Sequence, residues 1–224
     1  MNIHKALSLS FIVGLLFLRC GGTYKTGAVS GEYKDEVKVK CEAYLFDARV
    51  YHDNKYNSFR LEVFYNDSLI GLGGRGYLGK GALKGYITDD SLLVYFPESD
   101  EYIREQIVDL FNNSICIDSL SDFDLKALFS QFPDSVISSS ILDIESDYED
   151  EAKPSFKITA ESCDWTIDLF YGKQSSGWRL SEFYFDDGAD LRLRGRLREF
   201  QGDAEIAAGK FRAEIPASAV RIIP

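Results

Sequence analysis

Apolar and polar residues alternate with a period of two along most of the chain, and this alternation constrains the fold more than any other feature. In one segment, Phe59, Leu61 and Val63 would lie on the same face of a strand. Arg60 and Glu62, which stand between them, would lie on the opposite face. Such alternation is typical of antiparallel strands that bury one face. Comparable patterns occur at 41–51, 85–88, 91–96, 156–160, 165–171, 178–184, 191–198 and about 209–215. We therefore expect roughly ten strands, and the lack of helical patterns between them excludes a βαβ fold.

A segment in the middle of the chain departs from this alternation. Residues 122–132, DFDLKALFSQF, carry apolar side chains near helical spacing, and Ser121 with Asp124 forms a weak capping signal. We expect a short amphipathic helix that ends before Pro133. Its apolar stripe should pack on the core, and a partner site is the alternative. The expected fold is mainly β, a strongly curved antiparallel sheet that forms a half-open barrel with one or two short helices on its concave side.

Three local features complete these expectations. Residues 143–151, DIESDYEDE, should form a solvated acidic loop, since they lack the glycine and the ligand spacing of a calcium loop. Trp178, Leu180 and Tyr184 are expected on one face of a single strand. The Asp-Gly pair at 187–188 marks the hairpin turn that follows.

A cluster of seven glycines lies within residues 71–85, GLGGRGYLGKGALKG. It contains a GxGxxG pattern from Gly71 and a GxxxxGK pattern from Gly74, both of which occur in nucleotide-binding loops. Each of those loops must lead directly into a helix that holds the phosphate. Here a strand is expected instead, so we interpret the glycines as positions where a strand bends or another element approaches closely.

Every second residue between 192 and 198 is an arginine, namely Arg192, Arg194, Arg196 and Arg198. On a strand these four side chains would point to one face. They could contact anionic lipid headgroups, or they could pair with carboxylates such as Glu182 and Asp186 on the neighbouring strand. The chain is acidic overall, so we favour the ion pairs.

Charge and composition exclude several classes of function. The 224-residue chain has a formal net charge of -11, whereas nucleic-acid binding needs a basic surface. Its two histidines are His4 and His52, and His52 precedes the turn-forming Asp53 and Asn54. The sequence contains no recognisable nucleophile–base pair and no cluster of metal ligands. We expect neither catalysis nor a cofactor nor a metal site.

The N-terminus, MNIHKALSLSFIVGLLFLRC, has the pattern of a secretory signal. Lys5 is followed by an apolar run at 6–18, shorter than the about 20 residues that span a bilayer. The run ends at Cys20, which resembles the cysteine that bacterial lipoproteins lipidate. Arg19 replaces the small residue usual before that cysteine. A secreted protein without lipid and an uncleaved anchor are therefore the alternatives.

These features predict the organisation of the chain. Residues 1–19 are expected to be the signal peptide, 20–36 a flexible tether and 37–224 a single half-barrel domain. Removal of the signal peptide would leave three cysteines besides Cys20, namely Cys41, Cys116 and Cys163. We expect them to be small buried side chains, and one disulfide is the alternative.

Several segments resemble the LolA/LolB-like superfamily of lipoprotein localisation factors. They are FRLEVF at 59–64, YLGKGA at 77–82, GYITDDSLLVYFP at 85–97, Tyr102, GWRL at 177–180 and FRAEIPASA at 211–219. In that superfamily, a turn carrying Leu-Gly-x-Gly leads into strands of similar sequence. The similarity extends over residues 37–222. It implies an unclosed β-barrel with a helical lid and a hydrophobic cavity for acyl chains.

The concave face of such a half-barrel is apolar, and it can accept lipid where helices cover it incompletely. We expect the cavity to be lined by Phe59, Leu61, Val63, Leu92, Val94, Trp165, Ile167 and Leu169. The alternative is that these side chains only form the core beneath the helix.

The expected function is that of an outer-membrane lipoprotein that faces the periplasm. It would bind lipid or lipoprotein acyl chains in envelope biogenesis and contact the membrane through its N-terminal lipid anchor. The alternative is a structural or interaction lipoprotein that scaffolds an envelope protein partner and holds no ligand.

Overall fold

The computed structural model describes residues 37–52, 54–66, 69–76, 79, 81–88, 90–106, 127–137, 142–160 and 164–222. The strands of this part are β1 (Lys38–His52), β2 (Lys55–Tyr65), β3 (Ile70–Arg75), β4 (Gly81–Ile87), β5 (Ser91–Phe96), β6 (Glu101–Gln106), β7 (Leu142–Asp147), β8 (Ser155–Ala160), β9 (Thr166–Gln174), β10 (Gly177–Asp186), β11 (Arg192–Ala207) and β12 (Val220–Arg221). Its helical turns are η2 (Ala127–Phe129), α3 (Pro133–Val136) and η3 (Ala208–Phe211). The predicted signal peptide, Cys20, the tether, Cys116 and Cys163 lie outside the described residues.

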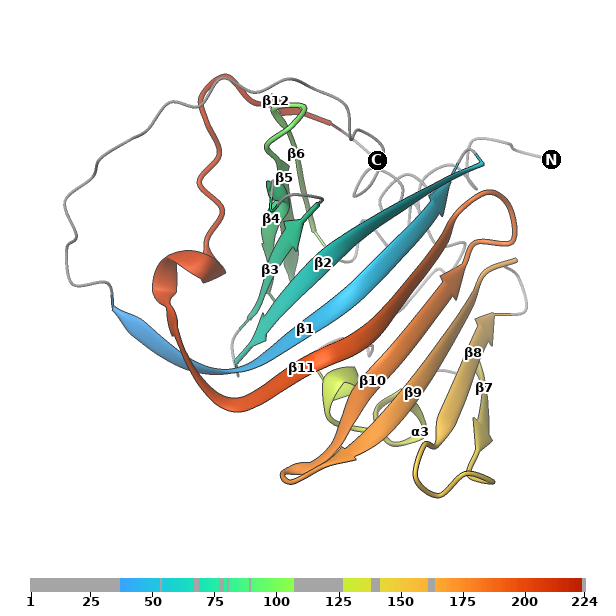
Figure 1. The fold of residues 1–224 in the computed structure, drawn as a ribbon. Helices are drawn as coiled ribbons and strands as arrows, with labels where there is room; N and C mark the ends of the chain where they lie inside the picture. The colour runs from blue at the N-terminus through green and yellow to red at the C-terminus, as the bar shows by residue number, and fades with distance from the viewer. Residues whose placement is uncertain are drawn as a thin grey trace.

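The twelve described strands form one sheet in the order β12-β6-β5-β4-β3-β2-β1-β11-β10-β9-β8-β7. Strands β1 to β6 follow one another as an antiparallel meander, and β7 to β11 form a second meander. Strands β1 and β11 pair at the centre and join the two. Figure 1 shows that the sheet is strongly curved, and its edge strands β12 and β7 do not pair with each other. The expected mainly β, half-open barrel is confirmed.

Strand register determines which side chains share the concave face, because residues paired across neighbouring strands project to the same side. Tyr44 on β1 pairs with Val63 on β2, and Val63 pairs with Leu72 on β3. On the other side of β1, Val50 pairs with Leu193 on β11. These residues all contribute to one apolar cluster, which extends across both meanders.

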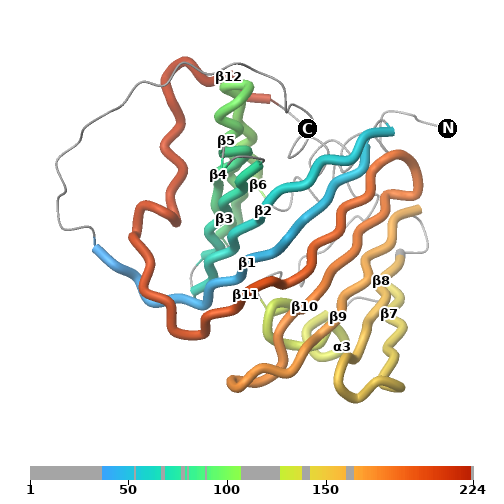
Figure 2. The backbone as a smooth tube through the Cα atoms, in the orientation of Figure 1, coloured from blue at the N-terminus to red at the C-terminus, as the bar shows by residue number. Residues whose placement is uncertain are grey.

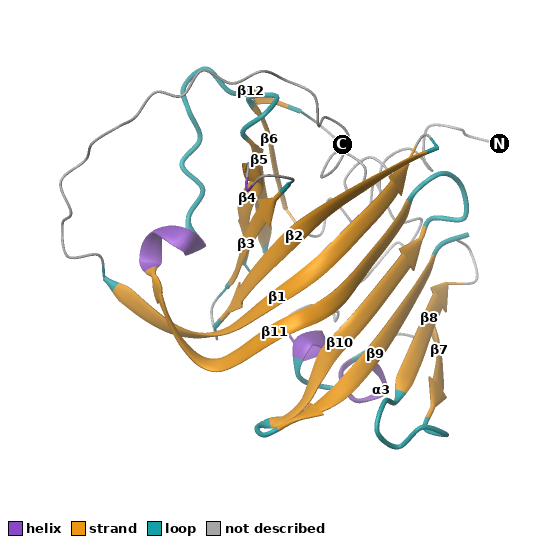
Figure 3. Cartoon of the chain, viewed as in Figure 1, coloured by secondary structure: helices purple, strands orange, loops and turns teal. Residues whose placement is uncertain are grey.

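The turns η2 and α3 pack against this cluster (Figure 3). The Tyr171 hydroxyl on β9 donates a 2.8 Å hydrogen bond to the carbonyl oxygen of Leu128. The ring of Phe129 lies 5.2 Å from that of Tyr44, and the ring of Phe132 lies 5.0 Å from that of Phe156. The described part of the predicted apolar stripe therefore packs on the core, as expected.

The prediction of one helix that ends before Pro133 is wrong within the described residues. Residues 127–129 form a 3-10 turn, Phe132 is extended with ψ 144°, and Pro133 begins α3. A proline pushes the residue before it out of the helical region, and its own fixed φ suits the first position of a helix. Pro133 therefore separates two short turns.

Because of a β-bulge in β10, Tyr184 does not share a face with Trp178 and Leu180, contrary to the prediction. The register against β9 shifts between Leu180 and Glu182, so the alternation changes phase there. Trp178 and Leu180 belong to the concave cluster, but beyond the bulge Phe183 takes that face. Tyr184 points to the opposite face.

Two other expectations are corrected. The acidic run is solvent-exposed as expected, but only 148–151 lie in a loop, because the run begins as edge strand β7, whose exposed carboxylates suit a strand with one open side. Residues 209–215 do not form the last strand, because η3 ends at Phe211 and 212–219 run without sheet pairing to β12 (Figure 2). Strand β12 pairs with β6 in parallel.

A smaller apolar cluster covers the convex face near η3. Buried Cys41, Phe64, Ala204 and Phe211 form it, and Cys41 is a free thiol. A Cβ atom on Gly71 would lie 3.1 Å from the Phe211 ring, so this glycine lets η3 pack closely on β3. The expected close approach at the glycine cluster therefore occurs at Gly71.

Candidate functional site

The eight side chains predicted to line a cavity lie in the two apolar clusters of the concave face. Phe59, Leu61, Val63, Trp165, Ile167 and Leu169 belong to the large cluster beneath η2 and α3, and Leu92 and Val94 to a second cluster on β4, β5 and β6. Leu72 and Ile87 pack against both clusters and so connect them. The concave face therefore brings all eight residues into one continuous apolar surface.

Burial divides the eight into two groups. Phe59, Val63, Leu92, Val94, Trp165 and Leu169 are each at most 8% exposed and pack against protein atoms. Leu61 and Ile167 are only half-buried. Of the eight predicted residues, Leu61 and Ile167 are therefore the two that keep apolar surface accessible to a ligand.

Other half-buried apolar side chains extend this surface, and sequence analysis did not single them out as cavity residues. They include Leu72, Ile87, Phe183, Leu193 and Leu197. Simple alternation identifies Leu193 and Leu197 as apolar-face residues. The bulge in β10 shifts the alternation, so the sequence pattern does not place Phe183 on this face.

A mostly buried ion pair connects β10 to β1. Nη2 of Arg179 lies 2.6 Å from Oε1 of Glu42, and the Tyr44 hydroxyl donates a 2.6 Å hydrogen bond to Oε2 of the same carboxylate. The guanidinium also stacks over the ring of Phe200. Burial, together with the bond to Glu42, raises the pKa of Tyr44, so the hydroxyl stays protonated. This network fixes one end of the concave cluster.

Most of the arginine row on the convex face forms ion pairs, as the sequence analysis favours. Nε of Arg192 lies 3.1 Å from Asp186, and Arg198 lies 3.6 Å from Asp47. Nε of Arg194 donates a 2.8 Å hydrogen bond to Glu182. In the described part of the chain, Arg196 has no such partner.

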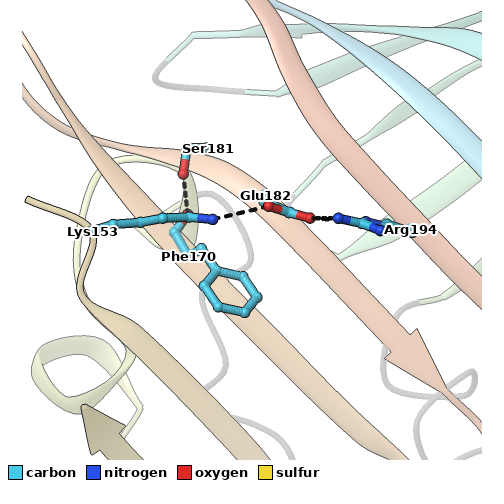
Figure 4. A network of polar contacts seen from close by, with 5 residues as sticks. All are labelled: Lys153, Phe170, Ser181, Glu182 and Arg194. Atoms are coloured by element: carbon cyan, nitrogen blue, oxygen red, sulfur yellow. Dashed lines mark hydrogen bonds and ion pairs between the residues drawn. The ribbon is translucent and has the colours of Figure 1, made fainter. Parts of the chain in front are cut away.

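Glu182 is shared between two cations (Figure 4). Besides Arg194, it accepts a 3.1 Å hydrogen bond from Nζ of Lys153, which also lies over the Phe170 ring. Burial alone would raise the pKa of Glu182, but the bonds from Arg194 and Lys153 outweigh it and hold the pKa below its usual value.

The glycine cluster and His52, the two remaining candidates from the sequence, lie in or beside turns between strands. The glycine cluster lies in the β3–β4 hairpin, where strand β4 follows at the position that a phosphate-binding loop needs for a helix. His52 ends β1 two residues before Asn54, which has a positive φ of 58° at the turn. Among the described residues, no helix is long and apolar enough to cross a membrane.

No protein-family model and no curated protein matches the sequence. Solved structures that match this one over most of its length include the following three. An uncharacterized conserved protein from Thermus thermophilus is 13% identical, with a TM-score of 0.40 over 80% of this chain and 90% of its own. A domain named for outer membrane lipoprotein sorting, from Vibrio parahaemolyticus, is 7% identical, with a TM-score of 0.43 over 76% and 88%. A DUF1329 family protein from Desulfovibrio piger is 9% identical, with a TM-score of 0.44 over 95% and 98%.

Proposed function

We propose that this protein is a lipid-binding lipoprotein of the outer membrane that holds lipid or lipoprotein acyl chains against the concave face of its sheet. The proposal assigns it a binding role and no catalysis. It includes membership of the LolA/LolB-like superfamily, lipidation at Cys20 and an orientation toward the periplasm.

One observation carries the acyl-chain assignment. Half-buried apolar side chains lie together on the concave face, and from six of its strands they include Leu61, Leu72, Ile87, Ile167, Phe183, Leu193 and Leu197. An acyl chain that covers their exposed parts gains about 25 cal/mol for each Å² of apolar surface removed from water. Two short turns, η2 and α3, pack on the same cluster, so a bound acyl chain would lie beside them.

Native mass spectrometry of the protein from residue 21 onward tests this proposal. We expect additional mass from co-purified phospholipid or fatty acid, released when the protein is denatured. A protein that stays free of ligand after incubation with phosphatidylglycerol and phosphatidylethanolamine would contradict it.

The scaffold alternative has one observation in its favour. Six of the eight predicted cavity residues are at most 8% exposed, so they serve as core whether or not a ligand binds. A ligand-free protein that retains a specific envelope partner in affinity purification would support this alternative.

A further inference from the structure

A groove of about 880 Å³ lies on the convex face, opposite the proposed acyl-chain surface. It crosses β1, β2, β3 and β11, and five arginines line it, namely Arg49, Arg60, Arg75, Arg194 and Arg196. Ala48 and Phe59 of the same strands belong to the apolar core of the concave side. Since side chains alternate along a strand, the neighbouring Arg49 and Arg60 project to the other side. We call this feature the arginine groove.

Strand register places like charges directly opposite each other in the arginine groove. Arg49 pairs with Arg194 across β1 and β11, and Arg60 pairs with Arg75 across β2 and β3. Like charges at directly paired positions destabilise a sheet. An anion bound between them would reverse that repulsion.

Carboxylates of the protein neutralise the arginine groove only in part. Arg75 and Arg194 pair with Glu62 and Glu182, neither of which lines the groove. Arg49, Arg60 and Arg196 form no ion pair with any residue that the structure describes. The single acidic residue among the described lining residues is Asp47, which stands opposite Arg60 and Arg196 in the strand register and forms its ion pair with Arg198 at 3.6 Å. A chain with a net charge of -11 thus gathers cations on one surface.

We propose that the arginine groove binds a phosphate-bearing anion, with Arg49, Arg60 and Arg196 as its principal donors. The planar guanidinium of arginine matches phosphate oxygens in a bidentate arrangement. Ser58 also lines the groove and offers a neutral hydroxyl donor. The phosphate belongs either to a phospholipid headgroup or to a soluble phosphate compound. This site is separate from the concave face, so the proposal does not depend on acyl-chain binding.

Calorimetry on the full mature protein in neutral detergent tests the proposal with three probes. Dihexanoyl phosphatidylglycerol and dihexanoyl phosphatidylcholine differ only in headgroup, and inorganic pyrophosphate carries phosphate without lipid. The double variant Arg49→Gln, Arg60→Gln removes two donors that have no ion pair in the described chain. The matched control, Arg104→Gln with Arg212→Gln, removes the same charge at two exposed positions outside the groove.

Binding should weaken roughly tenfold or more in the groove variant, because each arginine near a phosphate surface contributes about fivefold. The control should bind like the parent. Loss confined to phosphatidylglycerol identifies a headgroup, and loss for pyrophosphate identifies a soluble phosphate. Equal binding by both variants, or no binding of either anionic probe by the parent, would overturn the proposal. So would a groove variant that unfolds at a much lower denaturant concentration than the control, because the arginines would then serve folding.

Discussion

Arg179 on β10 reaches across the intervening strand β11 to Glu42 on β1, with 2.6 Å between guanidinium Nη2 and carboxylate Oε1. The two side chains are only 11% and 21% exposed. This pair therefore connects strands that are not neighbours, in a place where an uncompensated charge is costly.

Glu42→Gln should lower the free energy of unfolding by about 3 kcal/mol, because it leaves a buried guanidinium without its countercharge. Urea unfolding followed by circular dichroism measures this. The control is Glu105→Gln, which breaks a pair with the half-exposed Arg221 and should cost less than about 1 kcal/mol. Equal costs for the two variants would show that the Arg179 pair is effectively solvated.

Ile167→Gln should weaken binding of phosphatidylglycerol acyl chains roughly tenfold, because an amide without a partner would face the lipid tail. Ile167 is half-buried, so the variant should still fold. Fluorescence titration with phosphatidylglycerol that carries a labelled acyl chain provides the measurement. The matched control is Thr166→Gln on the opposite face of β9, and it should bind like the parent. Unchanged binding by a folded Ile167→Gln would place the ligand elsewhere.

Gly195→Ala should destabilise the protein by about 1–3 kcal/mol through overpacking. A Cβ atom at this position would collide with the ring of Phe183 on β10. Gly202→Ala on the same strand is the control, since its Cβ atom would lie 3.7 Å from the Phe200 ring, an ordinary contact. Differential scanning calorimetry should show a lower Tm for Gly195→Ala alone. A similar Tm for both would mean that Phe183 moves aside freely.

Acidification should remove the stability that Glu182 contributes. The pKa of its carboxyl in the folded protein lies below the ordinary value of 4.5, because Arg194 and Lys153 outweigh the effect of burial. The contribution is therefore complete above the unfolded pKa and is lost as the pH falls through the folded pKa. The difference in Tm between the parent and Glu182→Gln should be largest near neutral pH and vanish in acid. A difference that does not depend on pH would indicate that Glu182 acts only through packing.

Cys20→Ser should move the protein from the membrane to the soluble fraction, because the variant cannot receive acyl chains at that position. Each buried methylene of an anchor contributes about 0.8 kcal/mol, so loss of the chains should release the protein almost completely. Fractionation with immunoblotting measures the distribution. Retention in the membrane would favour an uncleaved N-terminal anchor.

Sequence periodicity predicts most strands here because each buries one face, as β2 does with Phe59, Leu61 and Val63. It fails where one residue changes the phase, as at the bulge after Leu180. It also fails for 212–215, which have an extended pattern but no pairing partner in the described sheet. An extended segment and a strand of a sheet can share the same sequence pattern, because only tertiary contacts distinguish them.

The two proposed sites differ in how far sequence could predict them. The alternation of apolar and polar residues predicts which side chains form the concave face, once the sheet is assumed to curve. The arginine groove does not, because Arg60 and Arg194 come together only through the ladder between β1 and β11. A single sequence does not reveal which distant strands pair.

The pairing of β1 with β11 has a consequence for the order of folding. Tyr51 pairs with Arg192 and Lys38 with Ala207, so the centre of the sheet joins the first described strand to one near the C-terminus. Contacts this distant in sequence form slowly, since the chain first loses the entropy of closing a long loop. A chain that ends before residue 192 would leave β1, a strand of 15 residues, as an open edge. We therefore expect nascent or truncated forms to aggregate through β1 until β11 has been synthesised.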